Sequence, residues 1–67
     1  MKVLGVFHLG PDQYRVRARQ GGCDYQHEHI FVDKTDAAVF AGKVALKGVL
    51  DLNRWKEIGN GDREVES

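Results

Sequence analysis

The stretch Asp33–Gly48, DKTDAAVFAGKVALKG, decides the fold because it is the only segment long and periodic enough to form a helix. Its apolar residues recur at three- and four-residue spacing, which predicts one stripe that packs on the rest of the chain. The predicted stripe consists of Val39, Phe40, Val44 and Ala45, with Ala37, Ala41 and Leu46 at its flanks. Lys43 and Lys47, four residues apart, mark the side expected to face solvent.

Both ends of this helix carry residues that can cap it. The side-chain oxygens of Asp33, Thr35 or Asp36 can accept from the first free backbone N–H groups, so each of the three is a candidate cap. At the other end Gly48 suits the left-handed position that closes a helix, and Val49 is placed for the apolar contact that follows such a stop. These capping residues therefore predict a helix bounded by Asp33 and Gly48.

Three strands are predicted before the helix. Lys2–Leu9 is apolar throughout, Tyr14–Arg19 alternates between apolar residues and arginine, and His27–Val32 is rich in aromatic and β-branched residues. The first turn contains Gly10, Pro11 and Asp12, and Gln20–Asp24 with its two glycines forms the second reversal. Because both links are short, the three strands form an antiparallel sheet.

After the helix, Trp55–Ile58 predicts a brief strand, although a second short helix from Leu52 with Asp51 as its cap fits the same residues. Trp55 is expected in the core rather than at an interface. The predicted fold class is therefore α+β: a three-stranded antiparallel sheet packed by one helix, with a short C-terminal strand or turn. Residues 1–59 form one domain, and the polar, glycine-containing residues 60–67 form a flexible tail.

Composition limits the function classes. The 67 residues include ten basic and ten acidic side chains, so no net charge draws the chain to nucleic acid or to an anionic membrane. A single cysteine rules out an internal disulfide and fits a reducing compartment. No run approaches the roughly 20 apolar residues of a membrane span. We expect a soluble cytoplasmic protein.

Alternation assigns side chains to the two sheet faces. If the helix covers Tyr14, Val16, Ala18, Ile30 and Val32, then the uncovered face carries the predicted contact residues Arg15, Arg17, Arg19, His27, His29 and Phe31. In the first strand, Val3, Phe7 and Leu9 are expected inward, and Leu4, Val6 and His8 outward. Arginine among aromatic and aliphatic side chains is the composition enriched at protein interfaces, which predicts a protein-binding surface. The partner is a target protein or a second copy of the chain.

Three other interpretations of these residues have weaker support. Cys23, His27 and His29, with His8 from the neighbouring strand, offer four zinc ligands, but their spacing fits no common zinc module and the arginines would repel a cation. The alternating arginines could bind successive phosphates of a nucleic acid while neighbouring aromatic side chains stack on its bases. The neutral net charge of the chain argues against this interpretation. Histidines beside arginines could act as acid and base, yet no catalytic motif is present. No enzyme activity, metal or cofactor is predicted.

In size, neutral charge and strands-then-helix layout, the chain resembles the small accessory proteins encoded by phages and mobile elements, among them inhibitors of the anti-CRISPR type. The resemblance covers the chain as a class and transfers no functional residue. It implies an inhibitor that sterically blocks a host protein complex, such as a CRISPR effector. Steric blocking is favoured over DNA mimicry because mimics of nucleic acid are strongly acidic and this chain is neutral.

Overall fold

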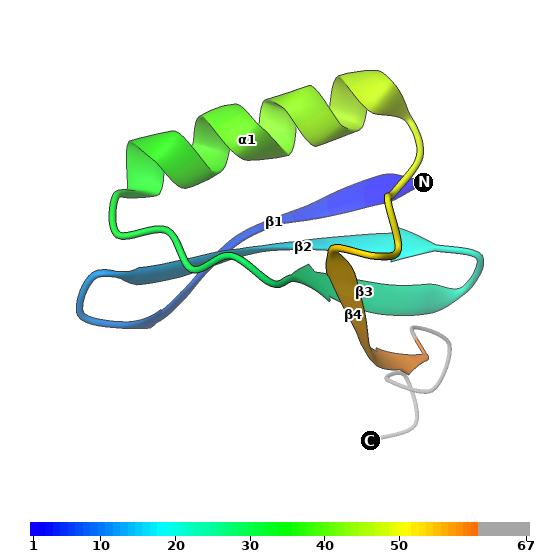
Figure 1. The fold of residues 1–67 in the computed structure, drawn as a ribbon, viewed down its shortest axis with the longest axis horizontal. Helices are drawn as coiled ribbons and strands as arrows, with labels where there is room; N and C mark the ends of the chain where they lie inside the picture. Colours follow the sequence, from blue (N-terminus) through cyan, green and yellow to red (C-terminus); the bar gives the residue numbers. More distant parts are fainter. Residues whose placement is uncertain (61–67) are drawn as a thin grey trace.

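The computed structural model describes residues 1–60 and has a two-layer α+β architecture (Figure 1). The chain forms strands β1 (Lys2–Gly10), β2 (Gln13–Gln20) and β3 (Cys23–His27), helix α1 (Lys34–Lys47), and strand β4 (Trp55–Asn60). The four strands make one antiparallel sheet in the order β1-β2-β3-β4, and α1 packs mainly across β1 and β2 on one face. The predicted fold class is confirmed.

Helix α1 begins and ends where its capping residues predict. Asp33 is the N-cap, and its carboxylate Oδ1 accepts from the backbone N–H of Thr35 at 2.7 Å. Gly48 adopts the left-handed conformation (φ 76°) and donates its N–H to the carbonyl of Val44 at 3.2 Å. A residue with a Cβ is strained at this φ, so glycine suits this position.

The buried side of α1 is narrower than predicted. Ala37 and Val44 are buried, and Phe40 packs half-buried against the core with Ala41. Three residues of the predicted stripe, Val39, Ala45 and Leu46, are instead exposed. Apolar residues lie on both sides of this helix, so its periodicity could not separate the core side from the solvent side.

The third strand lies earlier in the sequence than predicted. Gly21 and Gly22, both at positive φ, form a two-residue turn that starts β3 at Cys23, and β3 ends at His27. Between β3 and α1 the chain returns to β2 at a single bridge, where Tyr14 and Phe31 exchange two backbone hydrogen bonds of 2.8 Å. The prediction of a strand at His27–Val32 is therefore wrong.

The faces of β1 also differ from the prediction, because a bulge interrupts its alternation. The register against β2 shifts between Val3 and Gly5, where Gly5 has φ 132°. Val3 and Val6 consequently both pack on the core, although they are three residues apart. The predicted inward position of Phe7 and outward positions of Val6 and His8 are wrong, since strict alternation does not survive a bulge.

The C-terminal segment is a strand, and the alternative short helix does not form there. Strand β4 pairs with β3, extends the predicted Trp55–Ile58 segment to Asn60, and buries Trp55 to 7% exposure. The expectation that Trp55 is a core residue is confirmed. The remaining predicted tail, residues 61–67, lies outside the described residues. The buried apolar core consists of Val16, Ala18, Ala37, Val44, Leu50 and Trp55.

Candidate functional site

The three arginines of β2 lie on the sheet face away from α1, as predicted, but all three are engaged within the fold. Arg15 donates from Nη1 to the backbone carbonyl of His27 at 3.4 Å. Arg17 donates from Nε to Oε1 of Gln26 at 3.0 Å, and its guanidinium carbon stands 4.4 Å from the centre of the Phe7 ring. Arg19 donates from Nε to Oδ1 of Asp24 at 2.7 Å. These contacts hold neighbouring strands together, and they restrict what the three guanidinium groups can offer to a partner.

Asp24 is a site residue that the sequence interpretation missed. It is only 3% exposed and pairs with Arg19 at directly opposed positions of β2 and β3. A two-residue turn at Gly21–Gly22 places these residues opposite each other, so the glycine pair was the signal that could have found it. Together they border a hollow of about 300 Å³ on the outward face, lined by Leu4, Phe7, Arg17, Arg19, Asp24 and Ile58.

The other three predicted contact residues do not share the arginine face. Strand β3 pairs Tyr25 with buried Ala18, and alternation from Tyr25 puts His27 on the side of α1. The His27 ring contacts the Phe40 ring of α1, with centroids 4.5 Å apart. Phe31 also contacts the Phe40 ring, at 5.4 Å, and packs on the core.

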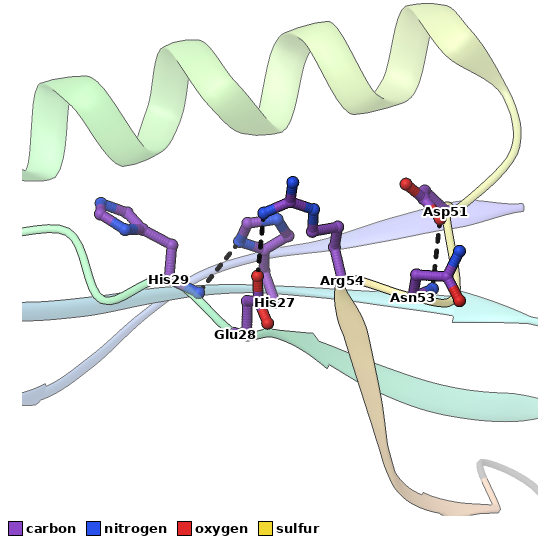
Figure 2. Close-up of polar contacts among 6 residues, drawn as sticks. All are labelled: His27, Glu28, His29, Asp51, Asn53 and Arg54. Atoms are coloured by element: carbon purple, nitrogen blue, oxygen red, sulfur yellow. Dashed lines mark hydrogen bonds and ion pairs between the residues drawn. The ribbon is translucent and has the colours of Figure 1, made fainter.

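His29 follows the same side as His27. Figure 2 shows both histidine rings pointing toward α1, and the His29 ring meets the edge of Phe31 with centroids 4.6 Å apart. The predicted single surface of arginines, histidines and phenylalanine is therefore wrong. The alternation predicts Ile30 and Val32 on the inward side, whereas both are exposed and it is His29 and Phe31 that face the helix. Partner binding by Arg15, Arg17 and Arg19 stays a prediction.

A groove opens between the C-terminal half of α1 and the start of β4. We call it the basic groove, and its volume is about 330 Å³. Its floor is aromatic: the rings of Phe40 and Trp55 stack with centroids 6.2 Å apart, and His27 meets Trp55 edge-on at 4.9 Å. The lining residues are His27, Phe40, Lys43, Val44, Lys47, Val49, Asp51, Arg54 and Trp55.

The charges around the basic groove are mainly positive. Lys43 and Lys47 come from α1 and Arg54 from the loop before β4, against the single carboxylate of Asp51 among the lining residues. Arg54 also pairs with Glu28 at 3.2 Å, but the two side chains are 67% and 55% exposed, so this ion pair contributes little free energy. The guanidinium of Arg54 can therefore turn to a ligand at low cost.

Hydrogen bonds from its backbone N–H groups hold the loop that carries Arg54. Asp51 accepts from the N–H of Asn53 at 3.2 Å through its side chain and from the N–H of Arg54 at 2.9 Å through its carbonyl. The backbone N–H of Leu50 donates to Oε1 of Gln20 at 2.9 Å, which ties the loop to the end of β2. Figure 2 shows the Asp51 contact and the Arg54 side chain reaching over His27 toward Glu28. The rim of the groove is thus preorganised.

His27 forms a neutral wall of the basic groove. Its Nδ1 accepts from the backbone N–H of His29 at 3.2 Å, so the ring hydrogen lies on Nε2. Burial lowers the pKa of His27 below its ordinary value, and the charges of His29, Arg54 and Arg15 lower the pKa further while Glu28 opposes them. At neutral pH the ring therefore serves as an aromatic contact surface without charge.

This pKa shift predicts that acid destabilises the fold. Because the pKa of His27 is lower in the folded chain than in the unfolded one, the unfolded chain binds its proton more readily once the pH falls below about 6.5. The free energy of unfolding should fall from pH 7.5 to pH 5, and His27→Gln should reduce that slope. Urea unfolding at several pH values measures both, and an equal slope in the two proteins would contradict the prediction.

A metal site is not formed by the histidines and cysteine considered above. Within residues 1–60, no group of three His, Cys, Asp or Glu side chains lies close enough to hold an ion. Cys23 and His27 occupy opposite ends of β3, about 13 Å apart at the usual rise per residue. His8 instead stacks on Tyr14, with ring centroids 4.6 Å apart.

Comparison with protein-family models, with curated proteins and with solved structures gives no match to this chain. Within residues 1–60, α1 is too short and too polar to cross a bilayer.

Proposed function

We propose that this chain is a non-enzymatic protein-binding module whose basic groove receives an acidic segment of a partner protein. The proposal rests on one observation: the basic groove combines an aromatic floor with three cationic side chains at its rim. The floor can bury one apolar side chain, while Lys43, Lys47 and Arg54 attract flanking carboxylates. This combination favours a segment in which an aromatic or aliphatic residue is flanked by Asp or Glu.

The surroundings of the groove support a macromolecular partner. Val49, which lines the groove, and Leu52, in the loop that forms one side of it, are both exposed. A partner segment that lies along the loop would cover these side chains as well as the floor. Burial of such apolar area is the main favourable contribution at protein interfaces.

A peptide-display selection tests the proposal. Immobilised protein is panned against a random peptide library, and the selected peptides are expected to place Asp or Glu beside an aromatic or aliphatic residue. Binding of the best labelled peptide should weaken about tenfold or more in the double variant Lys47→Glu/Arg54→Glu, because both attractive charges are reversed. Fluorescence polarisation measures the dissociation constants.

Two matched variants locate the contact. Lys56→Glu reverses one positive charge opposite Gln26, on the far face of the sheet, and should leave peptide binding unchanged. Arg15→Glu reports on the arginine face. Peptides without acidic residues, or a loss of binding in Arg15→Glu with none in the groove variant, would contradict the groove as the contact surface.

Within this proposal, the narrower role is that of an inhibitor that occupies a surface of a host protein complex, such as a CRISPR effector, in the cytoplasm. The class resemblance in size and layout supports this role, and the groove gives it a contact chemistry. The partner would be a host protein with an exposed acidic and apolar segment. Nucleic acid is the alternative ligand, through the arginine face, but the engagement of Arg17 with Gln26 and Phe7 weighs against it.

A further inference from the structure

The solvent side of α1 is apolar, which is unusual for a helix at a protein surface. Val39 is 53% exposed and Leu46 is 89% exposed, and Thr35 and Gly42 lie on the same side. These four residues alternate at spacings of four, three and four, the spacing of a seam between two paired helices. We call them the outer seam. In Figure 1 the side of α1 away from the sheet is uncovered over its whole length.

We infer that the outer seam binds the same seam of a second copy of this chain, forming a symmetric antiparallel helix pair. In the register that sets Val39 opposite Gly42 of the second copy, each large side chain meets a small one, and Leu46 meets Thr35. Gly42 leaves room for this contact, because no atom lies within 4 Å of the place where its Cβ would stand. The two-fold axis makes every contact occur twice.

Charge complementarity selects the second copy as the occupant and fixes the register. Asp36 and Lys43 are seven residues apart, so they lie on the same flank of the outer seam. In the antiparallel register above, Asp36 of each copy lies next to Lys43 of the other, which gives two opposite-charge pairs. The register shifted by seven residues would instead bring Lys43 next to Lys43, and like charges oppose it.

The size of the contact predicts a weak dimer. A helix of 14 residues is about 21 Å long, so one pair of such helices buries less surface area than a permanent dimer needs. We expect a dissociation constant on the order of 100 µM. Two basic grooves on one particle would bind a partner with repeated acidic segments more tightly than one groove does.

Sedimentation velocity of the full chain from about 10 µM to about 1 mM tests the dimer. The parent should change from monomer to dimer over this range, and Leu46→Glu should remain a monomer. Because Leu46 is almost fully exposed in the single chain, this variant should keep its fold, which far-UV circular dichroism checks. A parent that stays monomeric, or a Leu46→Glu variant that is folded and still dimeric, would overturn the inference.

Charge reversal tests the register. Asp36→Lys and Lys43→Asp should each raise the dimer dissociation constant about fivefold or more, and the double variant should restore it to within about twofold of the parent. Lys56→Asp, on the opposite side of the molecule, is the matched control and should have no effect. A double variant no better than the single ones would overturn the antiparallel pairing. Peptide binding to the groove, measured at about 1 µM protein, is independent of Leu46 and separates this result from the proposed function.

Discussion

Phe40→Ala is expected to remove about 3 kcal/mol from the free energy of unfolding. The Phe40 ring contacts three aromatic rings from three other segments: His27 at the end of β3, Phe31 in the following loop, and Trp55 at the start of β4. Removing the ring leaves a cavity where α1, β3 and β4 meet. We place the cost at the lower end of the usual range for Phe→Ala because Phe40 is half-buried.

A loss of this size is large for so small a domain. At about 0.05–0.15 kcal/mol per residue, the whole chain has a stability of about 3–10 kcal/mol. Urea unfolding followed by far-UV circular dichroism measures the change. Val39→Ala, at the next position of the same helix but on its exposed side, is the matched control and should cost less than about 0.5 kcal/mol at low protein concentration. Equal losses in the two variants would mean that α1 presents a different side to the sheet.

Local signals in the sequence were sufficient to predict helix α1 and strand β2, but not the position of β3. Asp33 and Gly48 fix the ends of α1 through side-chain and backbone hydrogen bonds that involve only near neighbours. The alternation of apolar residues and arginines in β2 likewise reports one covered face without reference to the rest of the chain. Such signals act within a few residues, which is why the α+β class and the helix bounds were predictable.

The assignment of side chains to faces was not predictable, because it depends on register. The bulge at Leu4–Gly5 reverses the side on which Val6 lies, and only pairing with β2 reveals it. His27 and Phe31 turn toward α1 because the Gly21–Gly22 turn pairs Tyr25 with Ala18. Periodicity alone could not show which of two apolar sides of such a strand faces the core.

The basic groove illustrates the same limit. Its cations come from positions 43, 47 and 54, and its floor joins α1 to β3 and β4. These residues do not lie together in any one stretch of the sequence, so no sequence motif could have predicted the groove. Lys43 and Lys47 were predicted on the solvent side of the helix, and they are exposed, but the aromatic neighbours that give them a binding role come from other elements.

Trp55→Ala is expected to cost about 3–5 kcal/mol, the largest effect of any substitution proposed for this chain. Trp55 is 7% exposed at the first position of β4, stacks on Phe40, and meets the edge of His27, its pairing partner on β3. It thus holds β4 to α1 and β3 at once. Since Trp55 is the only tryptophan, unfolding must be followed by circular dichroism rather than by fluorescence.

The variant Trp55→Phe separates two contributions of Trp55 to stability: the volume that its side chain fills and the contact of its ring with Phe40. It keeps an aromatic ring near Phe40, so it should cost less than half as much as alanine. If the Phe40–Trp55 contact stabilises the fold, the double variant Phe40→Ala/Trp55→Ala should cost less than the sum of the single variants by about 0.5–1.5 kcal/mol. Because either alanine variant can unfold the domain outright, the cycle is measured with Phe40→Leu and Trp55→Phe if needed. Strict additivity would show that the two rings stabilise the fold independently, and the groove floor would then lack the rigidity that the proposed peptide binding requires.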